Sequence, residues 1–211
     1  MAATEVLTLS SSDGAMLEAE IARPPGTPTR GVVLCHPHPQ YGGTMRSLVI
    51  GALFEGLPDI GAVTLRFNFR GVEASTGVHD GGRAERDDAS AAVRALAPML
   101  PADSPLVLVG WSFGADIALS VLDPEVTSWV AIAPSLRLIA DLDAVARDPR
   151  HKLLVLAEHD EVCPPSEAAA IADTWSHVDV EVVGGASHFF VGRTDRLSEL
   201  VIGFVARQAR S

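Results

Sequence analysis

Residues 106–122 read Leu-Val-Leu-Val-Gly-Trp-Ser-Phe-Gly-Ala-Asp-Ile-Ala-Leu-Ser-Val-Leu, and no other segment constrains the architecture as strongly. The continuous apolar run Leu106–Val109 predicts a buried strand, and Phe113–Leu122 has the pattern of a helix. Between them lies Gly-Trp-Ser-Phe-Gly, with Ser112 at its centre. Glycine is needed two residues to either side, because side chains there would collide with the neighbouring strand and helix. The pattern predicts a tight strand-to-helix turn that exposes the Ser112 hydroxyl at the N-terminus of a helix.

The rest of the chain alternates between short apolar runs and stretches of helical periodicity, after an N-terminal hairpin around Ser-Asp-Gly at 12–14. Strands are predicted at Val6–Leu9, Met16–Ala22, Val32–Cys35, Ala62–Phe67, Leu106–Val109, Trp129–Ile132, Leu153–Ala157 and Val178–Val183. Helices are predicted at Met45–Leu57, Arg83–Leu100, Phe113–Leu122, Leu138–Arg147, Ser166–Ser176 and Thr194–Arg207. This order predicts an α/β fold, with about eight strands in a mostly parallel sheet and helices on both faces. No long linker interrupts it, so residues 1–211 are predicted to form a single domain.

The composition is that of an ordinary globular protein, with 47% hydrophobic and 20% charged residues. Sixteen basic residues against 27 acidic ones leave a formal net charge of −11, and no cluster of Lys and Arg is present. Phosphate backbones and anionic membranes attract such clusters, so we expect neither nucleic acid nor membrane as a partner. Two widely separated cysteines, Cys35 and Cys163, and the lack of a signal-peptide pattern favour a reduced, cytoplasmic location.

A serine hydroxyl is a weak nucleophile until a base accepts its proton, so Ser112 needs a histidine nearby. Parallel strands present their carboxyl ends at one edge of the sheet, where ligand sites collect. His188 follows the strand Val178–Val183 and should reach the same edge as Ser112. His177 precedes that strand and should lie at its wrong end. We therefore predict that His188 is the base.

The chain order serine, acid, histidine places the third catalytic group after the strand Leu153–Ala157. Three carboxylates follow that strand: Glu158, Asp160 and Glu161. We predict Asp160, because it lies clear of the strand end and the Val-Cys-Pro sequence after Glu161 restrains its loop. Its role would be to orient the imidazole and to stabilise the imidazolium. The two glutamates are expected to be solvated loop charges.

The loop after the strand Val32–Cys35 reads His-Pro-His-Pro-Gln-Tyr-Gly-Gly-Thr-Met and is predicted to help bind a developing oxyanion. Proline has no N–H group to donate. That leaves the backbone N–H of His38, with Gln40 or Tyr41 as alternatives. The other donor is predicted to be the N–H of Phe113, the residue directly after the nucleophile.

His36 and His38 are two residues apart and also suggest a metal site. A zinc site needs three or four ligands, and no further cluster completes one. We therefore expect no metal and no organic cofactor. Cys163 is interpreted as a small buried hydrophobe rather than a second nucleophile.

Tyr41, Trp111 and Arg70 are predicted to lie near the active edge and are candidates for contact with a substrate. A guanidinium matches a carboxylate with two parallel hydrogen bonds, so Arg70 would bind an acidic group. The alternatives are that Arg70 braces a loop through a salt bridge and that Trp111 is a packing residue.

Two further stretches have a family likeness: Cys-His-Pro-His-Pro-Gln-Tyr-Gly-Gly-Thr-Met at 35–45 and Arg-Phe-Asn-Phe-Arg-Gly-Val-Glu-Ala-Ser-Thr-Gly at 66–77. With the serine turn, they resemble the α/β-hydrolase superfamily from Val32 to Arg207, and within it a small, cap-less bacterial subgroup. The chain is similar, more distantly, to dienelactone hydrolases and to serine aminopeptidases. The resemblance implies the α/β-hydrolase fold and a triad made of the serine, aspartate and histidine predicted above.

The sequence departs from its relatives at three points. Glu73 stands where the subgroup usually carries a glycine in an Arg-Gly-x-Gly-x-Ser loop. Dienelactone hydrolases use a cysteine nucleophile, whereas this chain has Ser112, so their specific activity is not implied. Peptidases of the superfamily insert a large lid after the sixth strand, and the segment from Ala133 to His151 is too short for one. We therefore expect no substantial lid and an open, shallow pocket.

These residues and the resemblance predict a serine hydrolase that cleaves small to medium carboxylic esters through an acyl-enzyme on Ser112. Thioesters and small amides are alternative substrates for the same triad. A hydrolase-fold protein that binds without turnover is the alternative outside enzymes, and a degraded triad would favour it. The expected partner is a small-molecule ester, and the oligomeric state is left open.

Overall fold

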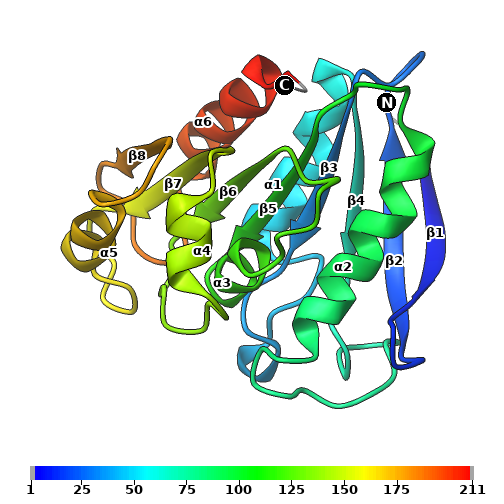
Figure 1. The fold of residues 1–211 in the computed structure, drawn as a ribbon, viewed down its shortest axis with the longest axis horizontal. Coiled ribbons are helices and arrows are strands. Elements are labelled where there is room, and N and C mark those ends of the chain that lie inside the picture. The colour runs from blue at the N-terminus through cyan, green and yellow to red at the C-terminus, as the bar shows by residue number, and fades with distance from the viewer. Residues whose placement is uncertain (1–2, 210–211) are drawn as a thin grey trace.

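The computed structural model describes residues 3–209, so the two residues at either end of the predicted 1–211 domain lie outside it. Within this range, eight strands form one sheet in the order β1-β2-β4-β3-β5-β6-β7-β8 (Figure 1). Strand β2 runs antiparallel to β1 and β4, and the other neighbouring pairs are parallel. The strands are β1 (Ala3–Ser10), β2 (Met16–Arg23), β3 (Arg30–Cys35), β4 (Ala62–Phe67), β5 (Leu106–Trp111), β6 (Ser128–Ile132), β7 (His151–Ala157) and β8 (Val178–Val183).

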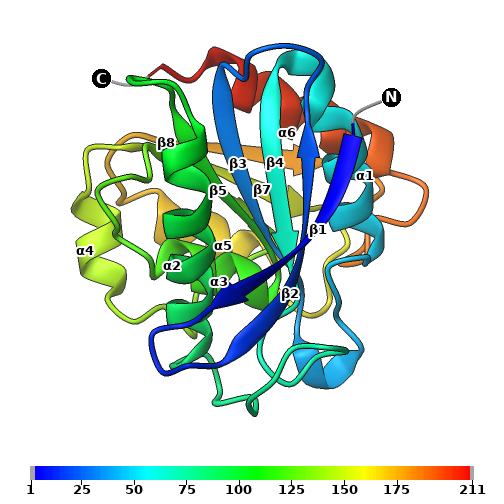
Figure 2. The same cartoon turned by 90° about the vertical axis from the view of Figure 1, so that its right-hand side faces the viewer.

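Helices cover both faces of the sheet, α1 and α6 on one face and α2 to α5 on the other. They are α1 (Leu48–Gly56), α2 (Glu85–Leu96), α3 (Phe113–Leu119), α4 (Leu142–Arg147), α5 (Pro165–Ala172) and α6 (Thr194–Arg207). Successive strand residues point to opposite faces and so supply both cores. In β3, Val32 and Leu34 belong to the core under α1 and α6, whereas Val33 and Cys35 belong to the core under α2 and α3. Figure 2 shows the β1–β2 hairpin at the edge of the sheet beyond β4.

The strand–helix order and the mostly parallel sheet confirm the predicted fold class. Strands β4 and β8 and helix α6 have the predicted bounds. The helix predicted over Arg83–Leu100 is shorter and ends at Leu96, where a 3₁₀ turn (Ala97–Met99) takes over. Pro98 lies in that turn, and proline lacks the N–H that would continue the helical ladder. No helix within residues 3–209 combines the length and the apolar character that crossing a bilayer requires.

The helix predicted over Leu138–Arg147 begins four residues later, at Leu142. The N–H of Leu138 donates instead to the carboxylate of Asp116 on α3 (3.1 Å). Asp141 then caps α4 by accepting the Ala144 N–H (2.9 Å). A tertiary hydrogen bond therefore overrides the local helical periodicity.

The parallel strands β3 and β5 to β8 end at the same edge of the sheet. Ser112 directly follows β5, Asp160 follows β7, and His188 follows β8. The topology thus collects three segments that are far apart in sequence, which is where the candidate site lies.

Candidate active site

Ser112 occupies the turn between β5 and α3 with φ 56° and ψ −119°, a backbone conformation that non-glycine residues rarely adopt. A Cβ on Gly110 would overlap the carbonyl of Gly114, and a Cβ on Gly114 would overlap the backbone of Cys35. Both glycines are therefore required, for the steric reason that the sequence predicts. The Ser112 N–H donates to the Ile132 carbonyl (2.8 Å), which anchors the strained turn to the end of β6.

The Ser112 hydroxyl lies against His188, with 2.9 Å between Oγ and Nε2. The other ring nitrogen, Nδ1, lies 2.8 Å from Oδ2 and 3.0 Å from Oδ1 of Asp160. Because a carboxylate only accepts hydrogen bonds, Nδ1 carries the ring proton and Nε2 presents its lone pair to Ser112. The structure therefore brings together the three side chains that the sequence predicted. His177 precedes β8 and lies at the opposite end of that strand from His188.

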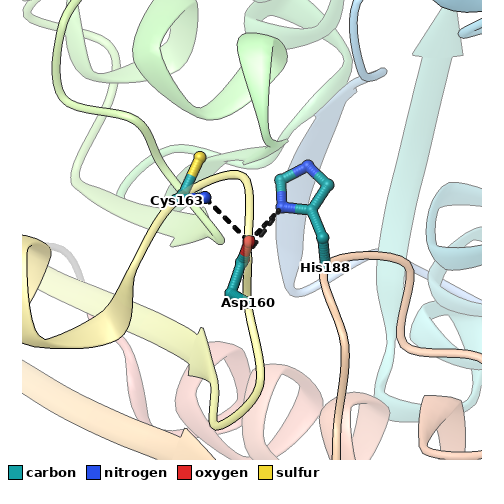
Figure 3. A group of neighbouring side chains, drawn as sticks. All are labelled: Asp160, Cys163 and His188. Carbon is teal, nitrogen blue, oxygen red and sulfur yellow. Dashed lines mark hydrogen bonds and ion pairs between the residues drawn. The ribbon is translucent and has the colours of Figure 1, made fainter.

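Asp160 is held in place by its own loop. Its Oδ1 accepts a hydrogen bond from the backbone N–H of Val162 (2.9 Å). It also accepts one from the backbone N–H of Cys163 (2.8 Å), which Figure 3 shows. The two other candidate acids face elsewhere: Glu158 is exposed and accepts a backbone N–H from the loop after β8, and Glu161 is exposed. Of the three carboxylates after β7, Asp160 is the one that meets His188.

Two backbone N–H groups at the pocket, those of His38 and Phe113, have no hydrogen-bond partner among residues 3–209. The alternative donors are engaged. The Gln40 N–H donates to Nδ1 of His38 (3.2 Å), and the Tyr41 N–H donates to the His38 carbonyl (3.1 Å). The His38 ring packs on the Phe113 ring with 5.0 Å between centroids, which holds the two segments together. Both N–H groups are therefore available to a bound ligand.

His36 is fully buried directly after β3 and uses both of its ring nitrogens. Nε2 accepts the Phe69 N–H (3.0 Å), so Nδ1 carries the proton and donates to the Pro37 carbonyl (2.6 Å). Burial lowers the pKa of His36 to about 3, which keeps the ring neutral. His36 ties the loop after β3 to the loop after β4. Neither nitrogen has a lone pair to offer a metal, so the pairing of His36 with His38 as ligands is not supported.

Acid should destabilise the protein through His36. Its pKa of about 3 in the folded chain lies below the value of about 6.5 in an unfolded chain, so the unfolded chain binds a proton that the folded chain does not. The stability contributed by His36 is complete above about pH 6.5 and is lost as the pH falls towards 3, by about 1.4 kcal/mol per pH unit. Urea unfolding at a series of pH values checks this.

A His36→Gln variant should show a shallower fall in the free energy of unfolding over the same pH window. His159→Gln is the matched control, because the His159 ring is largely exposed. Equal slopes in wild type and His36→Gln would refute the assignment.

The structure contradicts the prediction that Arg70 contacts the substrate. Its side chain is 5% exposed and forms a two-point ion pair with the buried Asp88 of α2, at 2.6 Å (Nη2–Oδ1) and 3.0 Å (Nε–Oδ2). Nη1 also lies 2.7 Å from Asp13 in the hairpin turn. Arg70 is not among the residues that line the pocket. A buried carboxylate left without its cation is costly, so the guanidinium is committed to Asp88 and braces the loop.

Glu73, the residue that departs from the family pattern, has φ 48°, in the left-handed region that favours glycine. Its carboxylate accepts hydrogen bonds from Asn68 Nδ2 (2.8 Å) and Arg46 Nη1 (2.7 Å). Asn68 in turn accepts the Met45 N–H (2.8 Å). Glu73 therefore braces the loop after β4 against the segment that follows the His38 loop, although its backbone is strained.

Ser112 and His188 open into a pocket of about 860 Å³ with mainly apolar walls. Tyr41 and Phe189 stand on its rim, 87% and 58% exposed. Trp111 lines the pocket and donates its indole N–H to the His188 carbonyl (3.2 Å), so it both bounds the site and supports His188.

The segment between β6 and β7 holds only the short helix α4, so the prediction that there is no substantial lid is confirmed. The expectation of a shallow pocket stays a prediction, and the pocket is roomy. Its volume lies in the upper part of the range for small-molecule sites. Residues of the loops after β3, β6, β7 and β8 line the pocket around Ser112, so its walls do not require a lid.

Asp116 is a pocket-supporting residue that the sequence analysis missed. It is fully buried on α3 and accepts hydrogen bonds from the Ser135 hydroxyl and from the backbone N–H groups of residues 136–138, the latter at 2.9 to 3.3 Å. Burial raises the pKa of Asp116, whereas these donors favour its charged form. The available signal was a single charged residue in the otherwise apolar helix Phe113–Leu119, because charges are rarely buried without partners.

Cys163 lies beside the aspartate–histidine pair, as Figure 3 shows. Ligand-type atoms of Asp160, Cys163 and His188 lie within 4.8 Å of one another, the one such grouping found within residues 3–209. Burial, with the nearby Asp160 carboxylate, raises the pKa of the Cys163 thiol to about 12. The thiol is therefore protonated at neutral pH and is a poor nucleophile. The hydrogen bonds of Asp160 with the His188 ring and with the Cys163 N–H account for the closeness of the group.

Comparison with known proteins identifies the family to which the fold belongs. No protein-family model matches the sequence. Uncharacterized protein RP471 of Rickettsia prowazekii (strain Madrid E) is 31% identical over 179 residues, which are 80% of this chain and 75% of the relative. An α/β serine hydrolase homologue from Coxiella burnetii is 34% identical, with a TM-score of 0.85 over 95% of this chain and 96% of that one. A lid-less α/β serine hydrolase from Xanthomonas campestris is 26% identical, with a TM-score of 0.85 over 97% and 94% of the two chains. The chain therefore belongs to the α/β-hydrolase superfamily, in its small group without a lid.

Proposed function

We propose that this α/β hydrolase cleaves small to medium carboxylic esters, with Ser112 as the nucleophile, His188 as the base and Asp160 as the orienting acid. The observation that carries the proposal is the hydrogen-bonded chain Ser112–His188–Asp160, which opens into a mainly apolar pocket. A serine is activated when a base lies within hydrogen-bond distance of its hydroxyl and a third group orients that base.

In the first step, Ser112 Oγ attacks the ester carbonyl carbon while its proton passes to His188 Nε2, 2.9 Å away. Asp160 stabilises the imidazolium through its contact with Nδ1. The carbonyl oxygen becomes an oxyanion and accepts hydrogen bonds from the backbone N–H groups of His38 and Phe113. When the tetrahedral intermediate breaks down, the alcohol leaves with the proton from His188, and the acyl group stays on Ser112.

In the second step, water enters through the open rim of the pocket and attacks the acyl-enzyme. His188 accepts a proton from this water and returns it to Ser112 as the acid is released. The same two N–H groups stabilise the second oxyanion. Each proton moves between groups of this chain, the substrate and water, so the scheme calls for no metal and no organic cofactor.

The pocket supports esters over peptides as substrates. Its mainly apolar walls suit a hydrocarbon chain, and its capacity of about 860 Å³ suits a small to medium ester.

Two buried thiols, Cys35 and Cys163, are free, which fits a reducing compartment such as the cytoplasm.

The first test is labelling of the folded protein with a fluorophosphonate probe, followed by peptide mass mapping. We expect one covalent adduct, on Ser112, because the probe reports an activated serine beside a working oxyanion site. Heat-denatured protein and Ser112→Ala should not react. If folded wild-type protein forms no adduct, the proposal fails, and a hydrolase-fold protein that binds without turnover becomes the better description.

A further inference from the structure

Arg137 is the only residue with a permanent charge among the described residues that line the pocket. It belongs to the wall between β6 and α4, together with Ser135 and Leu138. The ester cleavage proposed above makes no use of a guanidinium. In small-molecule sites, the few polar groups in a mainly apolar wall fix the orientation of the ligand and give specificity. A lone cation in such a wall therefore points to a ligand with an anionic group.

The backbone that presents Arg137 is held in a defined and strained position. Ala133 and Leu136 have φ values of 45° and 59°, in the region that favours glycine. The buried Asp116 holds this segment, and the Arg137 N–H is one of its donors (3.3 Å). The segment starts at the end of β6, where the last strand residue accepts the Ser112 N–H. The backbone of Arg137 is thus anchored to α3 and to the strand end that also holds the Ser112 turn.

The guanidinium has a weak ion pair that a ligand can replace. Nη2 of Arg137 lies 3.3 Å from Oε2 of Glu167, and the two side chains are 67% and 61% exposed. Exposed pairs of this kind contribute little to stability. Arg70 offers the contrast, because its two-point pair with the buried Asp88 leaves it unable to exchange partners. Arg137 is the arginine that is available to a ligand.

We infer that Arg137 selects esters that carry a carboxylate in addition to the ester group. The guanidinium binds that carboxylate with two parallel hydrogen bonds, and the apolar walls hold the hydrocarbon between them. The inference rests on the proposed esterase function and narrows its substrate class. A formal net charge of −11 repels anionic substrates in general, so a carboxylate ester needs a local cation at the pocket.

Two pairs of esters test the inference, because the carboxylate can sit on the acyl side or on the alcohol side. The acyl-side pair is mono-p-nitrophenyl adipate and the neutral p-nitrophenyl hexanoate. The alcohol-side pair is 4-carboxyphenyl hexanoate and the neutral phenyl hexanoate. The kcat/KM of each ester is measured for wild type, Arg137→Gln, Glu167→Gln and Arg147→Gln. The last variant is the matched control, since Arg147 is an exposed arginine outside the pocket whose partner is Asp143.

Arg137→Gln should lower kcat/KM about tenfold for at least one carboxylate ester and leave both neutral esters within about twofold of wild type. Glu167→Gln should raise kcat/KM for that carboxylate ester, because a competing carboxylate is removed, and Arg147→Gln should change neither class. Equal effects of Arg137→Gln on charged and neutral esters, or no effect on either carboxylate ester, would overturn the inference alone. Failure of wild type to hydrolyse any of the four esters would overturn the esterase proposal, and this inference with it.

Discussion

Replacing Ser112 with alanine is expected to lower kcat for p-nitrophenyl butyrate by about 10⁶-fold. The variant has no atom that can form the acyl-enzyme, and what remains is catalysis by the oxyanion donors and by binding alone. Folding should be unaffected, because the Ser112 side chain makes no capping hydrogen bond and alanine adopts the strained φ at a similar cost. Steady-state kinetics and a thermal melt measure both effects on the same samples.

Ser198→Ala provides the matched control for the Ser112 variant, since Ser198 lies on α6, outside the pocket. It should retain wild-type kcat and melt at the same temperature. A Ser112→Ala protein with activity close to wild type would mean that another group is the nucleophile. A variant that loses activity and also unfolds would need to be compared with Ser112→Gly before the loss is assigned to chemistry.

The second large effect is expected from Asp160→Asn, about 10⁴-fold in kcat. The reason lies in the loop that holds Asp160. Its Oδ1 accepts two backbone N–H groups, so an asparagine would keep its carbonyl oxygen there and turn its NH₂ towards Nδ1 of His188. The ring proton would then move to Nε2, which could no longer accept the proton of Ser112. Activity would fall although the fold and the side-chain positions stay the same.

Glu161→Gln makes the same carboxylate-to-amide change one residue away, at an exposed position. It should have wild-type kcat and the same dependence of kcat/KM on pH. A loss in Glu161→Gln comparable to that in Asp160→Asn would show that the charge of the loop, rather than the tautomer of His188, controls the rate.

The architecture could be predicted because its signals are local. Apolar runs and helical periodicity depend on neighbouring residues, and they predicted each strand of the sheet. The turn at Ser112 was predictable from a short motif. Gly110 is required by a collision with Gly114 only four residues away, whereas Gly114 is required by the backbone of Cys35 at the end of the neighbouring strand β3. Helix ends were less predictable where a long-range contact intervened, as at Leu138, whose N–H binds Asp116.

Parts of the site depended on partners that sequence spacing does not reveal. Arg70 was predicted to lie near the active edge, but the sequence does not show which carboxylate pairs with it. In the structure, Asp88 on α2 forms this ion pair, and Arg70 does not line the pocket. The donors that surround Asp116 come from a segment some twenty positions further along the chain, so the wall that carries Arg137 could not be foreseen.

The sequence by itself determined the order of the strands and helices, the serine turn at Ser112 and the sheet edge at which His188 would lie. These follow from steric and hydrophobic patterns within short windows and from the rule that parallel strands end at one edge. Only the tertiary structure decided that Asp160 meets His188, that Arg70 is buried against Asp88, and that the pocket is roomy. The first two outcomes depend on which distant groups pair with a charge that becomes buried, because an unpaired buried charge is costly. The pocket volume depends on how distant loops pack. Both are properties of the folded chain rather than of any one segment.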